Sequence, residues 1–174
     1  MGRIHLIAFD VDGTLTSGVI VMGPAGEACK CFHARDGMGL SMAHRLGYYT
    51  GVITGRSSSI VRRRAEELRM DFAEMDVKDK VAAMEDLRAR YGLAWDEIAY
   101  MGDDLNDLAL MMRVGLSGCP ADGAAEVRAR SSFLAAAPGG RGAAREFIEH
   151  ILKEEGRWDE AVRSFLTGAQ ESGQ

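Results

Sequence analysis

Residues 4–16 read Ile-His-Leu-Ile-Ala-Phe-Asp-Val-Asp-Gly-Thr-Leu-Thr, so a largely apolar run leads straight into two carboxylates. The run predicts a buried strand. Side chains two apart on an extended segment point the same way, which brings Asp10 and Asp12 together. Like charges this close are tolerated mainly where a cation or a reacting group lies between them. An ordinary Asp-Gly turn is the alternative for these residues taken alone.

Further apolar, β-rich runs alternate with segments of helical periodicity. The runs lie at 48–53, 72–75, 98–101 and 114–117, and the helical segments at about 37–46, 58–68, 80–91 and 105–113. This alternation predicts an α/β fold, a Rossmann-like three-layer sandwich with a mostly parallel sheet. The short gaps from residue 15 to 54 and from residue 54 to 80 leave no room for a large cap domain. Ligands bind beyond the carboxyl ends of the strands in such sheets. We therefore expect Asp10, Thr54 and the segment 102–107 to converge on one edge.

A β-hairpin is predicted at about residues 17–33, with a Gly/Pro turn at 23–26. Its first arm is apolar at four successive positions, Val19–Met22, so both of its faces need cover. A neighbouring subunit is the favoured cover, because exposed apolar patches usually mark an interface. The alternative is that the hairpin lies back across its own core.

The C-terminal part of the sequence predicts a strand-like stretch near 133–134, a flexible loop at 135–142 and a helix at 143–155. Residues 1–155 are expected to form one core domain that carries the hairpin. Residues 156–174 are expected to add an amphipathic helix, starting at Trp158, and a frayed polar tail from Thr167.

The composition is that of an ordinary soluble globular protein, with 174 residues, 47% of them apolar and 27% charged. A secretory signal and an apolar run of roughly 18–20 residues are both missing, so we expect a cytoplasmic protein that does not enter a membrane. The net charge of −5 argues against nucleic-acid binding. Cys29, Cys31 and Cys119 are expected to be reduced, and buried or half-buried.

Asp10 and Asp12 are suited to phosphate-ester chemistry. A carboxylate can attack phosphorus and form an aspartyl phosphate, which water breaks more easily than the original ester. Asp10 is the candidate nucleophile. Asp12 can give a proton to the leaving alcohol and later take one from water.

The segment 102–107, Gly-Asp-Asp-Leu-Asn-Asp, adds three carboxylates at the end of another strand. So many carboxylates at one edge call for a hard divalent cation, and Mg²⁺ fits because it favours oxygen ligands. The candidate carboxylates for this site are Asp10, Asp12, Asp103, Asp104 and Asp107. A helix N-cap is the alternative for Asp103 and Asp104, and capping and ligation can coexist.

Candidate phosphate-binding residues are Thr54, Gly55, Lys80 and Asn106. Thr54 and Gly55 lie between a strand and a helix, where hydroxyl and backbone N–H groups can receive phosphate oxygens. Lys80 opens a helix and can place an ammonium against the phosphate. Taken singly, a turn and a solvated lysine would explain these residues equally well. The run Arg62–Arg64 is expected on a solvated helix face.

In this order, the four motifs resemble those of the haloacid dehalogenase-like phosphohydrolases. The resemblance implies that Asp10 is the nucleophile, Asp12 the acid/base, Thr54 and Lys80 the phosphate holders and Asp103 a metal ligand. It also implies that Asp12 binds the metal through its backbone carbonyl and that Asp107 supports the metal.

Over nearly the whole chain, the sequence is similar to one branch of that family, the 3-deoxy-D-manno-octulosonate 8-phosphate phosphatases. The hairpin, the segment Phe32–Gly39 and the segment Gly139–Glu146 carry this resemblance. It implies a homotetramer in which a neighbour's hairpin closes the site, and a role in lipopolysaccharide biosynthesis. Departures at Ser17, Asn106 and Ala109, and in the segment after Trp158, leave the sugar acid open.

Three functions remain after these observations. The first is hydrolysis of the octulosonate 8-phosphate, and the second is hydrolysis of a nonulosonate 9-phosphate, of KDN or sialic acid, by the same residues. The third, from another class, is a phospho-accepting, receiver-like signalling domain, against which Asp12 argues because such a domain needs no acid/base partner. A non-catalytic scaffold is disfavoured by the complete set of reactive residues. Candidates for binding a substrate carboxylate are Arg35, Arg56, Arg141 and Arg145.

Overall fold

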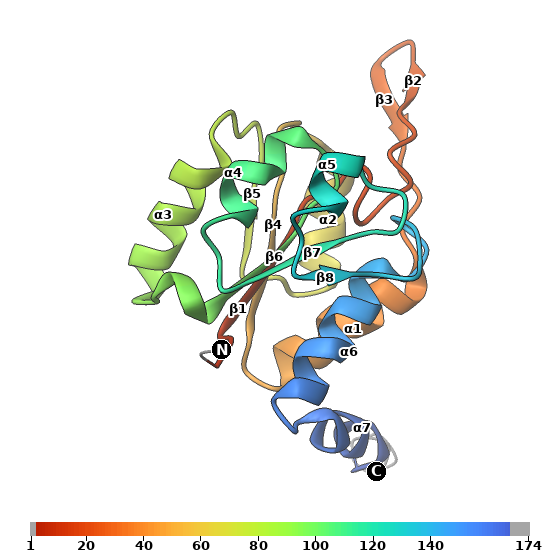
Figure 1. Cartoon of the computed structure of the whole chain (residues 1–174). Coiled ribbons are helices and arrows are strands. Elements are labelled where there is room, and N and C mark those ends of the chain that lie inside the picture. Colours follow the sequence, from red (N-terminus) through yellow and green to blue (C-terminus); the bar gives the residue numbers. More distant parts are fainter. Residues whose placement is uncertain (1–2, 168–174) are drawn as a thin grey trace.

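The computed structural model describes residues 3–167, in which a six-stranded sheet lies between two layers of helices (Figure 1). The sheet order is β5-β4-β1-β6-β7-β8, and all neighbouring strands are parallel. The strands are β1 (Leu6–Phe9), β4 (Tyr49–Ile53), β5 (Phe72–Glu74), β6 (Ile98–Met101), β7 (Leu116–Cys119) and β8 (Phe133–Leu134). The predicted α/β Rossmann-like fold is confirmed.

Strand β1 lies inside the sheet, and all four of its side chains are buried because helices cover both faces. The helices are α1 (Ala34–Arg45), α2 (Ser59–Glu67), α3 (Lys80–Tyr91), α4 (Leu108–Met111), α5 (Ala125–Arg128), α6 (Ala143–Glu154) and α7 (Trp158–Thr167), with 3-10 turns at Trp95–Glu97 and Leu105–Asp107. Leu40 of α1 and Phe147 of α6 belong to the core on one face, and Met84 of α3 and Leu110 of α4 to the core on the other.

Several predicted boundaries were wrong. The strand predicted from residue 4 begins at residue 6. Helix α1 begins at residue 34 rather than 37, and this puts Asp36 in the first turn, where a negative charge is favourable. Strand β7 begins at residue 116 rather than 114, because the Val114 amide bonds the Leu110 carbonyl at the end of α4 and the Gly115 amide bonds the Trp95 carbonyl. The helix predicted at 105–113 is a 3-10 turn followed by the single-turn helix α4.

Helix α3 has strong end signals on both sides. The carboxylate of its N-cap residue, Asp79, accepts from the amides of Val81 and Ala82 at 2.9 and 3.0 Å. Gly92 ends the helix at a φ of 68°, in the left-handed region that glycine adopts easily. This start places Lys80 in the first turn, where its side chain is buried at the sheet edge.

The hairpin consists of β2 (Val21–Gly23) and β3 (Gly26–Cys29), paired antiparallel outside the main sheet. It projects from the body of the domain (Figure 1). Val19, Ile20, Val21 and Met22 are 65%, 43%, 42% and 64% exposed. The alternative that the hairpin lies back across its own core is therefore wrong.

The three cysteines are free, but two of them are not buried. Cys119 is buried at the end of β7, as expected. Cys29 and Cys31 are exposed because the hairpin extends away from the domain, so the expectation of burial was wrong for these two.

Helix α7 packs on the domain rather than standing apart. Ala161 is fully buried, and the Arg157 guanidinium donates to the Leu46 carbonyl at 3.0 Å. Apart from Thr167, the predicted frayed tail lies outside the described residues. Within residues 3–167, no helix is both long and apolar enough to span a bilayer.

Candidate active site

The carboxyl ends of β1, β4 and β6 form a shallow cleft. The residues that line it are Asp10, Asp12, Thr54, Gly55, Arg56, Asp103, Asp104 and Asn106. Its volume is about 160 Å³, which is small beside the roughly 300–1,000 Å³ of ordinary small-molecule sites. The three predicted segments therefore do meet at one edge of the sheet. The cleft has room for little more than the phosphate end of a larger substrate.

Asp10 follows β1 directly and is held from below by Lys80. The Lys80 ammonium donates to Asp10 Oδ1 at 2.5 Å, to Asp107 Oδ1 at 2.6 Å and to the Tyr100 hydroxyl at 3.1 Å. All four side chains are buried. Lys80 is thus a fixed counter-charge, and the alternative of a solvated lysine is wrong.

Asp107 organises this cluster, although it lies at the floor of the cleft and is fully buried. Its Oδ1 accepts from Lys80 and from the Tyr100 hydroxyl, and its Oδ2 accepts from the amides of Asp103 and Asp104. A Cβ at Gly102 would lie 2.3 Å from Asp107 Cγ, so glycine is required for this close approach. With both oxygens used, Asp107 supports its neighbours and has little capacity left for a ligand.

Asp103 faces Asp10 across the cleft. Its Oδ1 accepts from the Thr14 hydroxyl at 3.1 Å. A Cβ at Gly13, which has a φ of 101°, would lie 2.0 Å from Asp103 Oδ2, so the turn after β1 must be glycine. The first turn and the 102–107 loop therefore fit directly against each other.

The two facing carboxyls are costly to ionise together. Burial, opposed by Lys80 but reinforced by Asp107, raises the pKa of Asp10 to about 6. Burial and the neighbouring charges of Asp10 and Asp107 raise the pKa of Asp103 to about 7. A bound cation would relieve this repulsion.

The donor set fits a hard divalent metal. Carboxylate oxygens of Asp10, Asp103 and Asp107 lie within 4.8 Å of one another. Because Asp107 is committed to protein donors, Asp10 and Asp103 are the side chains available to a cation. Oxygen-only donors are those that Mg²⁺ prefers.

On the opposite wall, Thr54 directly follows β4 and is buried, and Gly55 comes next. The Arg56 guanidinium Nε lies 3.8 Å from Asp12 Oδ2. Asn106 lines the cleft from an exposed position. Asp104 is exposed and caps the 3-10 turn by accepting from the Leu105 amide at 2.8 Å, so the capping alternative applies to it.

Two residues of this site were not predicted from the sequence. Tyr100 lies in the apolar run of β6, and the indication that was overlooked is that a buried tyrosine hydroxyl needs a partner. Lys30 follows the hairpin, and its ammonium bonds Asp12 Oδ1 and Glu27 Oε1. Nothing in the local sequence distinguishes Lys30 from a solvated lysine.

Three of the four candidate substrate arginines lie outside the cleft. Arg35, Arg141 and Arg145 line a separate groove of about 290 Å³ at the start of α6. The Arg145 guanidinium Nε donates to Glu149 Oε1 at 2.7 Å. Within one chain, only Arg56 is in position to meet a ligand of the cleft.

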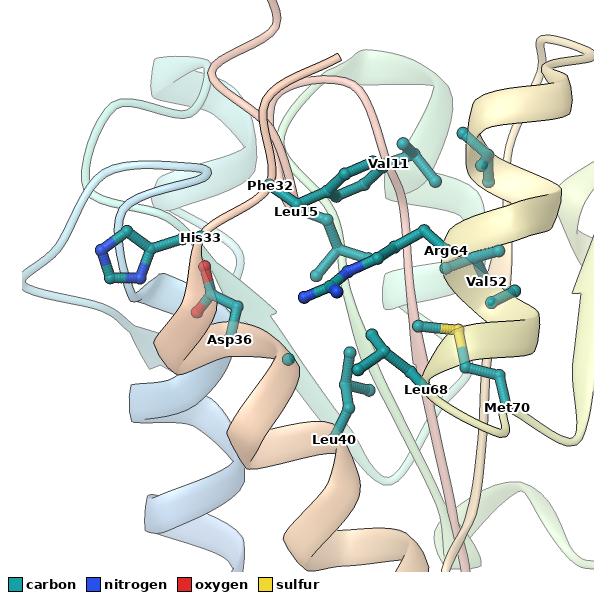
Figure 2. Close-up of a pocket in the computed structure, with 13 residues that line it drawn as sticks. Val11, Leu15, Phe32, His33, Asp36, Leu40, Val52, Arg64, Leu68 and Met70 are labelled. Carbon is teal, nitrogen blue, oxygen red and sulfur yellow. The ribbon is translucent and has the colours of Figure 1, made fainter.

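Arg64 does not lie on a solvated face, unlike its exposed neighbours Arg62 and Arg63. Figure 2 shows its side chain extending from α2 into an apolar space beside Phe32 and Leu40. Its guanidinium lies 5.8 Å from the Phe32 ring centroid and pairs with Glu67 at 2.9 Å. The remaining volume is about 10 Å³, so this space is packed and holds no ligand.

Residues 73–145 match the family described as haloacid dehalogenase-like hydrolase. The chain is 37% identical over 159 residues to the 3-deoxy-D-manno-octulosonate 8-phosphate phosphatase KdsC of Escherichia coli, a match that covers 91% of this chain and 85% of that protein.

Solved structures are similar over almost the same length. A probable phosphatase from Pseudomonas syringae superposes with a TM-score of 0.91 at 39% identity, covering 94% of this chain and 93% of that one. The 3-deoxy-D-manno-octulosonate 8-phosphate phosphatase of Moraxella catarrhalis, in complex with magnesium, phosphate and KDO, superposes with a TM-score of 0.90 at 37% identity, covering 94% of each chain.

Proposed function

Because this chain belongs to the haloacid dehalogenase-like hydrolases, and within them to the 3-deoxy-D-manno-octulosonate 8-phosphate phosphatases, we propose that it removes phosphate from 3-deoxy-D-manno-octulosonate 8-phosphate. The observation that supports this most directly is the placement of Asp10. Asp10 directly follows strand β1 inside the sheet, accepts a hydrogen bond from Lys80 and lines the cleft together with Asp12 and Asp103.

Hydrolysis proceeds in two steps. An oxygen of Asp10 attacks phosphorus, the ester P–O bond breaks, and the departing alkoxide takes a proton from Asp12. Water then gives a proton to Asp12 and attacks the aspartyl phosphate, which releases inorganic phosphate and restores Asp10. Lys80 keeps Asp10 oriented through both steps. The proposed receivers of the phosphate oxygens are Thr54, Gly55 and Asn106, and their position in the lining of the cleft supports this role.

Mg²⁺ is the proposed cofactor, since Asp10 and Asp103 offer the carboxylates and a relative with 37% identity is known with a magnesium ion. When bound, the metal screens the phosphate charge from the surrounding carboxylates. Asp107 holds the amides of the 103–104 segment and keeps Asp103 in place.

A nonulosonate 9-phosphate is the second candidate substrate, because the cleft of one chain holds only the phosphate end and does not distinguish the sugars. The receiver-like alternative is disfavoured by Asp12. It is positioned two residues beyond Asp10 in the same cleft, where it would speed the loss of an aspartyl phosphate that a signalling domain must preserve.

The assembly that we propose is a homotetramer formed through the hairpin. Four successive apolar side chains, Val19–Met22, are exposed on an arm that leaves the domain. A second copy of the chain would cover them and supply the missing walls of the shallow cleft. Arg141 and Arg145 are then candidates for meeting the sugar acid bound by a neighbour. The proposed setting is cytoplasmic lipopolysaccharide biosynthesis.

The test measures phosphate release with Mg²⁺ from 3-deoxy-D-manno-octulosonate 8-phosphate and from N-acetylneuraminate 9-phosphate. We expect many turnovers per chain and a kcat/KM at least about tenfold higher for the first substrate, which corresponds to about 1.4 kcal/mol. Asp10→Asn should abolish release while leaving the thermal unfolding profile cooperative.

Normal turnover by Asp10→Asn would refute the assigned nucleophile. A single stoichiometric phosphorylation without turnover would favour the receiver-like domain. A higher kcat/KM for the nine-carbon substrate would overturn the choice of sugar but not the chemistry.

A further inference from the structure

Lys30 stands where the hairpin returns to the domain, directly beside Asp12. Its side chain is only 1% exposed, and its ammonium bonds Asp12 Oδ1 and lies 2.8 Å from Glu27 Oε1. A buried ammonium with two carboxylate partners is fixed in place rather than solvated. One oxygen of Asp12 is therefore occupied by a residue from the hairpin.

The other oxygen of Asp12 is in a different state. Asp12 Oδ2 is buried and has no hydrogen-bond partner among the described residues. The Arg56 Nε atom lies 3.8 Å away, which is within ion-pair range but too far for a hydrogen bond. A buried oxygen without a partner is costly unless a ligand supplies one. The two oxygens of Asp12 thus differ: Oδ1 is bonded to Lys30, and Oδ2 has no hydrogen-bond partner among the described residues.

Glu27 fixes Lys30 in turn. Its carboxylate binds the Lys30 ammonium and accepts from the Ser58 hydroxyl, and Ser58 is the N-cap residue of α2. Glu27, which pairs with Met22 across the hairpin, thereby ties β3 to the start of α2 beside the cleft. Lys30 has a defined position even in a single chain.

We propose that Lys30 is a positioning residue for proton transfer, which holds Asp12 Oδ1 so that Oδ2 meets the oxygen of the leaving alcohol. The inference rests on the proposed function, in which Asp12 protonates that oxygen as the ester bond breaks. Lys30 itself exchanges no proton. Its effect is to fix the carboxyl group in the orientation that general-acid catalysis requires.

This role predicts a dependence on the leaving group. An alkoxide departs only with a proton, whereas p-nitrophenolate departs without one. Lys30→Met should lower kcat/KM for the sugar acid phosphate by about 100-fold and for p-nitrophenyl phosphate by less than about threefold, from the size of general-acid effects. The parameter kcat/KM reports steps through departure of the leaving group, so the later attack of water does not enter it.

A rapid-mixing experiment gives a second readout. Water attack on the aspartyl phosphate also needs Asp12, so in Lys30→Met this second step should become limiting. With p-nitrophenyl phosphate we expect a burst of p-nitrophenol approaching one per chain. A merely structural role for Lys30 would lower both substrates equally and give no new burst.

Two further variants keep the result interpretable. Adding Lys30→Met to Asp12→Asn should cause no further loss in kcat/KM, since both act through one carboxyl group. Glu27→Gln leaves Lys30 in the chain but loosens it, and should show the same leaving-group pattern with a smaller amplitude; it replaces Lys30→Met should that variant unfold below 37 °C. Lys78→Met, at an exposed lysine outside the cleft, is the matched control.

The outcomes separate the two proposals. If the wild-type protein releases phosphate from neither substrate, the proposed function fails. If it is active and Lys30→Met and Glu27→Gln lower both substrates equally, or not at all, only the role of Lys30 is overturned.

Discussion

Lys80, Asp10, Asp107 and Tyr100 form a buried polar cluster at the floor of the cleft, in which nearly every hydrogen-bonding atom has a partner. Complete satisfaction makes such a cluster rigid, since an unpaired group in the interior is costly. Asp103 stands just outside it and carries the charge that the cluster does not neutralise. The floor of the cleft is therefore rigid, whereas Asp103 at its rim lies in repulsive contact with the charges of Asp10 and Asp107.

The strain at Asp103 predicts a pH dependence of stability for the metal-free protein. Its pKa is raised to about 7 and that of Asp10 to about 6, both from 3.8. Between pH 4 and pH 7 the folded chain holds more protons than the unfolded chain, so the contribution of these two groups to stability falls as pH rises. Mg²⁺ should raise the unfolding midpoint by on the order of 5 °C more at pH 8 than at pH 5.

Thermal unfolding with chelator or Mg²⁺ at the two pH values checks this prediction. Asp103→Asn is the control, because it removes the group with the larger shift. In this variant both the decline toward pH 8 and the additional gain from Mg²⁺ should shrink. An Mg²⁺ effect that is equal at both pH values in the wild-type protein would contradict the account.

Elements were predictable where local sequence and burial agree. β1 is a continuous apolar run buried on both faces, and α3 has Asp79 and Gly92 at its ends, so both were expected where they lie. The helix predicted after β6 was wrong although the segment has helical apolar periodicity. The Asp107 carboxylate accepts from the amides of Asp103 and Asp104, and these bonds form a turn in place of a continuous helix.

The part of the site that follows from strand order was also predictable, whereas the part that depends on long-range side-chain contacts was not. Asp10, Thr54 and Asp103 follow strands, and the carboxyl ends of parallel strands meet at one edge. Tyr100 and Lys30 were not predicted, because their roles come from contacts with residues distant in sequence: Tyr100 bonds Lys80, and Lys30 bonds Asp12.

The loop before α6 packs backbone against backbone on the turn after β1. A Cβ at Gly139 would lie 1.7 Å from the Gly13 carbonyl oxygen, and the Gly140 amide donates to Thr14 at 2.9 Å. A main-chain atom cannot rotate aside as a side chain can. This loop therefore holds the first catalytic turn against the sheet edge.

Gly139→Ala should destabilise the protein by about 1–3 kcal/mol, the usual size of an overpacking effect, and should lower kcat because Gly13 is displaced. Urea unfolding and phosphate release measure the two effects. Gly23→Ala is the control, since a Cβ there would meet nothing closer than 3.3 Å. Wild-type stability and turnover in Gly139→Ala would show that the loop adapts and does not position the turn.

At the scale of the whole molecule, the hairpin is the part that a single chain does not explain. Strand β3 is tied to the cleft through Glu27 and Lys30, whereas Met22, opposite Glu27 on β2, is 64% exposed. Met22→Lys should therefore shift the light-scattering mass from tetramer toward monomer and lower kcat/KM for the sugar acid phosphate by at least about tenfold.

Met112→Lys is the matched control, because Met112 is 65% exposed but lies away from the hairpin. It should leave both mass and activity unchanged. If Met22→Lys keeps the wild-type mass, the exposed surface of the hairpin around Met22 is not the subunit contact. If it becomes monomeric with full activity on the sugar acid phosphate, the neighbour does not contribute to the site.

Because the cleft has a volume of only about 160 Å³, the residues that cleave the ester are distinct from those that would select the substrate. In the proposed mechanism, the side chains that break the ester all belong to one polypeptide, while most of the surface that would recognise the remaining carbons lies outside its cleft. Mutations in the hairpin would then change the substrate preference of the enzyme without altering a reactive side chain. Two paralogous chains that co-assemble would form mixed particles with a preference found in neither parent.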